Sequence, residues 1–227
     1  DLGYKNFAFI EGTFRRDYTS AEPVGNSIDT KSVGASFVFS DFIKNRKILS
    51  YGKIRASYGQ ILNSLGVYDL GTYYTPDPNK WQDRFGNSNF IETEPATLVN
   101  PALQGATNDE KEIGIETRWL KNRIGLTVTY WDRTNKDFPV NVTIPAQTGY
   151  TSVRTNAGEI AKTGIDLQLF LKPIQTKNFE WDINATWGRL IKNEVVSIAP
   201  GVDRLVSASG AFSGTSSAYT VSAVGQP

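Results

Sequence analysis

The amino-acid sequence predicts an all-β fold, an antiparallel up-and-down meander that forms part of a transmembrane β-barrel. Three observations favour this fold class. Apolar and polar residues alternate strictly in several segments, short and long connections alternate along the chain, and aromatic residues lie near both ends of the apolar faces. No segment carries a helical pattern of useful length, so we expect strands throughout.

The clearest alternation runs from Asn108 to Leu171. In its first segment Ile113 and Ile115 share one face with Trp119, whereas Glu116 and Arg118 occupy the other. The segments 124–138 and 157–171 alternate in the same way. A period of two over this length indicates extended strands with one apolar and one polar face. The short polar sequence 121–123 predicts a hairpin between the first two strands.

Four further segments show the same pattern, which brings the predicted total to seven strands. A closed single-chain bacterial barrel normally has an even number of strands, so we expect that the chain does not close by itself. The region 63–107, which contains four prolines, is expected to be irregular. The four further strands are Tyr4–Arg16, Ser32–Ile43, Ile48–Leu62 and Asn178–Glu194.

The connections divide into two classes that alternate along the chain, so all short turns fall at one end of the meander. Outer-membrane barrels have this layout, with short periplasmic turns and long outer loops. We therefore interpret residues 1–227 as one partial barrel domain. Short turns are predicted near 44–47, 121–123 and 173–178, and long loops near 17–30, 63–107, 139–156 and 194–227.

Six aromatic residues flank the aliphatic parts of the apolar faces. Aromatic side chains suit membrane interfaces because their polar tips contact headgroups and their bodies contact hydrocarbon. Alternation alone does not decide whether the apolar face meets lipid or a protein core, so a soluble β-sandwich is the alternative. The predicted interface aromatics are Phe42, Tyr58, Trp119, Tyr130, Trp181 and Trp187.

Composition excludes several functional classes. Lys and Arg number 24 and Asp and Glu 23, which gives no argument for a nucleic-acid partner. Cysteine and histidine are absent, so disulfides, thiolate metal sites and the commonest general base are excluded. We expect no cofactor and no metal site. The chain also lacks methionine and a signal sequence, and is expected to be a mature or internal piece of a longer protein.

Candidate chemistry is sparse. Ser50–Lys53 and Lys162–Gly164 match short signatures of penicillin-recognising enzymes, but on a strand Ser50 and Lys53 would point to opposite faces. Acidic residues at 92, 94, 109, 110 and 112 are interpreted as solvated charges at the base of a loop. We therefore predict no catalytic residue. Loop aromatics that could stack on a sugar or contact a lid, or merely pack the loop, are Tyr73, Tyr74, Trp81 and Phe85.

A series of short motifs recurs in order across nearly the whole chain. Together they resemble the barrel of the SusC/RagA-type TonB-dependent outer-membrane transporters, a family of the Bacteroidetes. The sequence departs from this family after Leu103, where it lacks a Trp-Glu pair. The motifs are Arg16-Asp17 with Thr19-Ser20, Lys53–Gly59, Asn100–Leu103, Glu110–Glu116, Asn122-Arg123, Tyr130, Thr134, Lys136-Asp137, Asn156–Glu159, Lys162–Asp166, Asn193 and Val224–Pro227.

The resemblance implies a fold and a pathway. Members of this family form barrels of roughly 22 strands around an N-terminal plug. It implies an outer-membrane location in a Gram-negative bacterium, contact with membrane lipids, and import of glycans or peptides with TonB energy. A SusD-type lipoprotein would cover the outer mouth, and the plug that contacts TonB is absent from this chain. The protein would not be an enzyme.

Two other classes remain open from the sequence. One is a soluble β-sandwich module that binds carbohydrate, in which the apolar faces would enclose a core. The other is a small, closed barrel that acts as an enzyme or adhesin, which requires an even number of strands within these residues.

Overall fold

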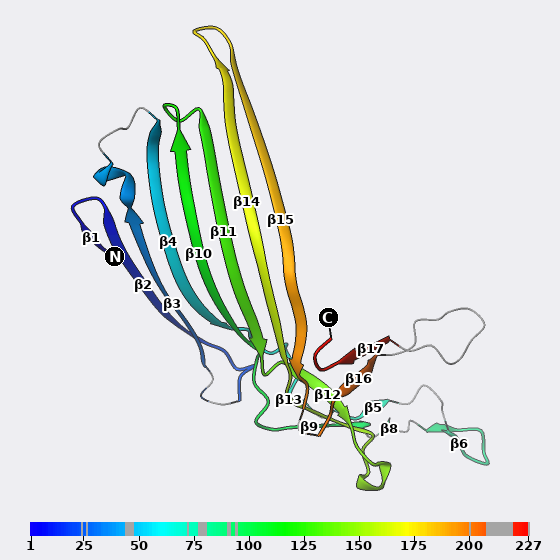
Figure 1. The fold of residues 1–227 in the computed structure, drawn as a ribbon. Coiled ribbons are helices and arrows are strands. Elements are labelled where there is room, and N and C mark those ends of the chain that lie inside the picture. Colours follow the sequence, from blue (N-terminus) through cyan, green and yellow to red (C-terminus); the bar gives the residue numbers. More distant parts are fainter. Residues whose placement is uncertain are drawn as a thin grey trace.

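The structure is a computed structural model that describes residues 1–23, 25, 27–43, 48–71, 73–76, 81–89, 92–93, 95–199, 201–207 and 220–226. One eight-stranded sheet dominates it, with neighbouring strands antiparallel throughout (Figure 1). This arrangement confirms the predicted all-β meander. In spatial order its strands are β1 (Leu2–Tyr4), β2 (Ala8–Tyr18), β3 (Ser27–Val38), β4 (Leu49–Leu62), β10 (Thr107–Trp119), β11 (Ile124–Lys136), β14 (Glu159–Gln175) and β15 (Glu180–Ser197).

The start of the sheet differs from the expectation of one strand over Tyr4–Arg16. Lys5 and Asn6 both adopt positive φ angles, 46° and 60°, and form a tight turn that separates β1 from β2. Asparagine tolerates this left-handed conformation better than most residues. The extra hairpin raises the sheet from seven predicted strands to eight.

The other described turns at this end are also short. β10 and β11 are joined at 120–123, where Lys121 and Asn122 again have positive φ, and β14 and β15 are joined at 176–179. β3 ends at Val38 and not at the expected Ile43, because the chain enters a 3-10 helix, η1 (Phe39–Phe42). The predicted turn at 44–47 lies outside the described residues.

The opposite end of the sheet carries the long connections, and these contain structure that the sequence did not reveal. A three-stranded sheet joins β12 (Pro139–Thr143), β13 (Ser152–Asn156) and β9 (Thr97–Val99), with β13 and β9 parallel. Strands therefore lie within the predicted loops 63–107 and 139–156. Smaller elements are β5 (Thr75–Pro76), β6 (Trp81–Gln82), β7 (Ser88–Asn89), β8 (Glu92–Thr93), η2 (Ala146–Thr148), β16 (Arg204–Ser207) and β17 (Thr220–Ala223).

Asn156 ties several of these loops together. Its Oδ1 accepts a hydrogen bond from the Gln104 N–H (2.7 Å), and its Nδ2 donates to the carbonyls of Gln104 (2.7 Å) and Asp137 (2.6 Å). Nearby, the buried Glu22 carboxylate accepts hydrogen bonds from the N–H groups of Leu65 (3.0 Å) and Gly105 (3.4 Å). Because one side chain satisfies several backbone groups, the loops are held at fixed positions above the sheet.

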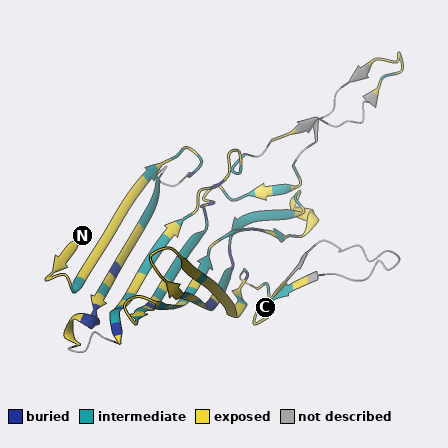
Figure 2. Ribbon diagram, turned by 90° about the horizontal axis from the view of Figure 1, so that it is seen from above, coloured by how far each residue is buried: buried dark blue, intermediate teal, exposed yellow. Residues whose placement is uncertain are grey.

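No second layer covers the long strands within the described part of the chain (Figure 2). Ile113 and Trp187 are more than half exposed, and Leu126 is 39% exposed. Such an uncovered apolar surface is unusual for a soluble monomer. The few buried apolar side chains are Val38, Leu49, Leu65, Leu103, Val140, Ala157 and Ile198.

Gly105 provides a test of the loop anchor. A Cβ atom there would collide with the backbone carbonyl of Asn63, so Gly105→Ala should destabilise the protein by about 1–3 kcal/mol. Gly59→Ala is the matched control, because the nearest heavy atom to its added Cβ, on Ser32, lies 4.0 Å away. Urea unfolding of the full-length protein in detergent measures both. Equal effects of the two substitutions would contradict this account of the anchor.

Candidate functional site: a membrane-facing surface and a polar inner face

The two faces of the sheet are continuous across its strands because the register keeps like residues side by side. Ile115 pairs with Ile54 on one side and Val128 on the other, and Val128 pairs with Leu167. On the opposite face, one residue along, Glu116 pairs with Lys53 and Thr127. The predicted apolar and polar faces of the separate strands therefore join into one apolar and one polar surface.

The apolar surface ends, toward the long loops, along a slanted line. On β2 the last apolar residue before the long loops is Phe14. Phe14 pairs with Lys31 of β3, Lys31 pairs with Gln60 of β4, and Gln60 pairs with Asp109, so on β10 this point of the boundary corresponds to Asp109. On β15 its last apolar residue is Trp187, which lies in register with Ile115 of β10. The line thus moves six residues along β10 across six strand-to-strand steps.

This slant gives the strand tilt relative to the edge of the apolar band. One residue per strand, at ~3.4 Å per residue and ~4.8 Å between strands, corresponds to a tilt of about 35°. Strands of outer-membrane barrels are tilted by about 35–45°. A flat membrane surface cutting across tilted strands produces such a stepwise boundary.

The width of the apolar band agrees with a bilayer. β10 and β15 each present four successive outward residues in the band, from Ile113 to Trp119 and from Trp181 to Trp187. Seven residues at ~3.4 Å, inclined by ~35°, span about 20 Å, comparable to the ~25 Å apolar band of outer-membrane barrels.

The predicted interface aromatics fall into three positions, and their contact with headgroups stays a prediction. Tyr58 lies at the loop-side edge and donates a hydrogen bond from its hydroxyl to Asp109 (3.0 Å), and Tyr130 and Trp187 lie on the same surface nearby. Trp119 and Trp181 lie toward the short turns. Phe42 is not on a strand as expected but in η1, where its ring stacks on Phe37 and meets Phe7 edge-on.

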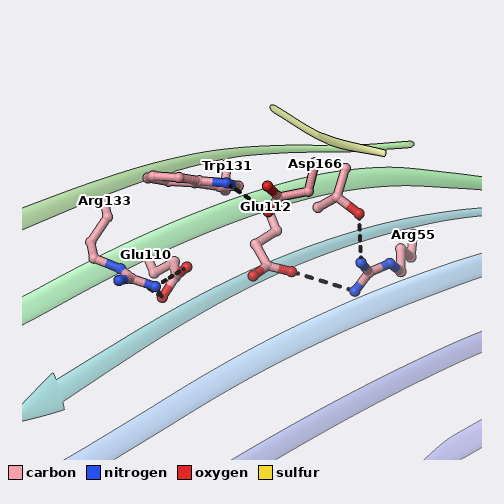
Figure 3. Close-up of polar contacts among 7 residues, drawn as sticks. Arg55, Glu110, Glu112, Trp131, Arg133 and Asp166 are labelled. Carbon is pink, nitrogen blue, oxygen red and sulfur yellow. Dashed lines mark hydrogen bonds and ion pairs between the residues drawn. The ribbon is translucent and has the colours of Figure 1, made fainter. Parts of the chain in front are cut away.

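The polar face holds charged groups in cross-strand networks (Figure 3). Arg55 donates to Glu112 (3.4 Å) and to the Thr129 hydroxyl (2.9 Å), which lies two strands away. Gly114 makes this reach possible, because a Cβ there would approach Arg55 Nε to 2.9 Å. Two open hollows of about 710 and 640 Å³ lie on this side of the sheet.

Trp131 is the large aromatic side chain in the middle of the network (Figure 3). Its indole N–H donates to Asp166 (2.9 Å), and its ring lies where a Cβ of Gly164 would be. The Arg133 guanidinium lies 5.6 Å from the indole centroid and donates to both oxygens of Glu110 at 2.8–3.1 Å. The alternation in 124–138 puts Trp131 on the polar face, but it was assigned no role from the sequence alone. Its pairing with Gly164 is known only from the register of the structure.

The loop aromatics chosen from the sequence lie on two different parts of the 63–107 connection. Tyr73 is 55% exposed, packs over Gly71 and meets the ring of Tyr68 edge-on. Phe85 is 73% exposed, at the turn between β6 and β7, with Arg84 beside its ring.

The other two loop aromatics are Tyr74, which is 60% exposed, and Trp81, which lies in β6.

Asp83 stabilises the β6–β7 turn. Hydrogen bonds from the side chain and backbone of Asn87 and from the Phe85 N–H lower the pKa of its carboxyl group.

The described residues contain no group of three or more His, Cys, Asp or Glu side chains placed to hold a metal ion. The Ser50 hydroxyl accepts a hydrogen bond from the Asn122 N–H (3.3 Å). None of the helices in the described part of the chain is long and apolar enough to span a membrane.

The slanted apolar band, the polar inner face and the antiparallel sheet define a wall segment of a transmembrane β-barrel. Residues 6–223 match the family model for the TonB-dependent receptor-like β-barrel, and the chain belongs to this family. The members of this family are TonB-dependent transporters of the Gram-negative outer membrane.

Individual relatives agree with this assignment. The chain is 25% identical over 200 residues to TonB-dependent receptor P39 of Formosa agariphila, which covers 86% of the chain and 18% of P39. It is 27% identical over 169 residues to TonB-dependent receptor SusC of Bacteroides thetaiotaomicron, covering 72% of the chain and 16% of SusC. The structure of the RagAB peptide transporter superposes with a TM-score of 0.78 at 23% identity, over 99% of the chain and 24% of that protein chain.

These relatives confirm the resemblance to the SusC/RagA type that the sequence motifs indicated. The chain spans less than a quarter of the length of each of these three proteins.

Substitutions on the two faces of the sheet, including the consecutive residues Leu126 and Thr127 of β11, test the assignment of the faces. Leu126→Arg, on the apolar face, should impair assembly by about 2–4 kcal/mol, as should Ile115→Arg. Thr127→Arg and Asp182→Asn, on the polar face, should be tolerated. Folding of the full-length protein into lipid vesicles, followed by the gel shift of the folded barrel, measures the difference. The reverse ranking would overturn the assignment.

Proposed function

We propose that the full-length protein is an active importer of the outer membrane and that residues 1–227 form part of its barrel wall. The observation that carries the proposal is the family match over 6–223 together with an apolar band of bilayer width. The wall is passive: it holds the pore open and seals it against lipid. Gating belongs to a plug domain, absent from this chain, that would receive energy from TonB.

The proposed cargo is an oligosaccharide or a peptide, delivered through a SusD-type surface lipoprotein. The name of one similar structure, the RagAB peptide transporter, supports a peptide as cargo, and the oligosaccharide and the lipoprotein follow from the resemblance to the SusC/RagA type. Tyr73, Tyr74, Trp81 and Phe85 extend from the long-loop end of the barrel and remain our candidates for contact with cargo or lid. The exposure of Tyr73, Tyr74 and Phe85 is compatible with that role.

We further propose that Trp131 and its neighbours contact cargo inside the barrel. Trp131 lies in register with Glu112, close to the loop-side edge of the apolar band, and faces the polar side. An indole held in place by Asp166 offers a flat apolar surface, and the Arg133–Glu110 pair beside it offers donors and acceptors. Sugars and peptides both present such mixed surfaces.

The two alternatives left open by the sequence lose support. A β-sandwich requires a second sheet over the apolar face, and the described strands provide none. A small closed barrel requires the sheet to return on itself, but β1 and β15 are free edges of the described sheet.

Extraction and uptake test the main proposal. The full-length protein should require detergent for release from the membrane fraction. Cells that carry it should accumulate labelled oligosaccharide or peptide only while the cytoplasmic membrane is energised, because TonB draws on that energy. Deletion of the gene provides the control. Recovery of the protein without detergent, or uptake that continues after an uncoupler is added, would contradict the proposal.

Substitution of Trp131 tests the inner contact. Trp131→Ala should lower the affinity for the imported solute by about 2- to 10-fold, through loss of one aromatic contact. Trp187→Ala removes an equally large ring from the outer face and should leave that affinity unchanged. Isothermal titration of the purified full-length transporter measures both. Unchanged binding in Trp131→Ala would remove this residue from the proposed cargo path.

A further inference from the structure

Cations are the commonest outward residues just beyond the loop-side edge of the apolar band. We consider, on each long strand from β2 to β15, the first polar outward residue on the loop side of the band. Four of the seven are cations and one is an acid, although the whole chain is nearly neutral. These residues are Arg16 (β2), Lys31 (β3), Gln60 (β4), Lys111 (β10), Asp132 (β11), Thr163 (β14) and Arg189 (β15).

Acidic residues follow the cations at a greater distance from the band. On β3, Asp29 lies one outward position beyond Lys31. On β10, Asp109 lies one outward position beyond Lys111. The same order, cation first and acid second, therefore holds on two strands well separated in the sheet.

A β-bulge establishes this order on β15. Gly164 pairs with Leu190 but the next residue, Thr163, pairs with Lys192, so Ile191 is the extra residue. Without the bulge Lys192 would point to the polar inner face, since bulges change the direction of the side chains that follow. With the bulge, Lys192 joins Arg189 on the outer face, and Glu194 follows one position farther out.

Three of these cations form no direct hydrogen bond or ion pair within the described residues, although Lys31 lies close enough to Asp29 to attract it electrostatically. Lys31, Lys111 and Arg189 are exposed, and none forms a hydrogen bond or ion pair with another residue in the described ranges. Arg16, in contrast, donates two hydrogen bonds of 2.6 Å to Asp29, and Lys192 pairs with Glu194 at 2.6 Å. We call Lys31, Lys111 and Arg189 the cationic fringe.

We propose that the cationic fringe binds the anionic phosphate headgroups of lipids in the leaflet on the long-loop side. The inference rests on the membrane orientation in the proposed function. Lys and Arg at this level can keep their alkyl chains along hydrocarbon while the charged ends reach the headgroups. The three cations of the fringe lie on three separated strands, each next to the slanted edge of the apolar band. Headgroups of lipids that surround the tilted strands would lie along the same edge. A compact partner protein or a single ion would need the three cations in one cluster.

Lipid titration tests the proposal on the full-length protein in a mild detergent. Native mass spectrometry would record binding of lipid A, which carries phosphate, and of zwitterionic phosphatidylcholine. Lys111→Gln/Arg189→Gln is the test variant. Lys53→Gln/Lys162→Gln removes two cations from the inner face and is the matched control, because both pairs change the net charge equally.

The wild type and the control should bind lipid A more tightly than phosphatidylcholine, and the test variant should bind lipid A about 30-fold more weakly than the wild type. Added salt should reduce the difference. Equal lipid A binding by the wild type and the test variant would overturn the proposal, as would an equal loss in the control. Displacement of lipid A by millimolar inorganic phosphate would also overturn it, because the fringe would then be a general anion site.

These outcomes are separate from failure of the proposed function. A protein that is recovered without detergent and binds neither lipid is not a membrane barrel. If the barrel inserts and transports but shows no preference for lipid A, the proposed function stands and the proposed role of the cationic fringe is refuted.

Discussion

The structure depends on one constraint: a single sheet must satisfy its backbone groups between strands while its two faces meet different surroundings. Hydrogen-bonded strands span a bilayer because no backbone donor or acceptor is left facing hydrocarbon. The sheet has no covering layer in the described residues, so its apolar side chains need lipid where a soluble protein would use a second sheet. The antiparallel register keeps those side chains on one surface from β2 to β15.

Glycines on the polar face leave space for large polar side chains that lie against the sheet. Gly114 leaves space for the Arg55 side chain to reach a strand beyond its neighbour, and Gly164 leaves space for the ring of Trp131. Gly188 similarly lies under Asp166, whose Oδ1 would be 2.8 Å from an added Cβ. Large polar side chains can therefore lie flat against the sheet and form hydrogen bonds to nearby strands.

The sequence predicted the parts of the fold that depend on local pattern. Alternation in 108–171 determined which side chains share a face, since parity along a strand needs no knowledge of its neighbours. The β1–β2 hairpin was missed because Lys5 and Asn6 interrupt the alternation for only one turn. The parallel pair β9–β13 was missed because its paired residues are 55 positions apart in the sequence and the pairing is only three residues long.

The site was less accessible to prediction than the fold. The outer-face aromatics were chosen from parity and distance to the turns, and the strand residues among them do lie on the apolar surface. Phe42 lies in η1 instead, because β3 ends at Val38. The Trp131 network, the slanted boundary and the re-aimed Lys192 all depend on register between strands, which a single sequence does not reveal.

The most direct test of the central claim is the environment of alternate residues on one strand. Single cysteines at 126, 127 and 128, spin-labelled in the full-length protein in bilayers, would be compared for accessibility to lipid-soluble oxygen and to a water-soluble nickel complex. The account predicts that positions 126 and 128 favour oxygen and position 127 favours nickel. Greater nickel accessibility at 126 and 128, or the same environment at all three positions, would contradict it.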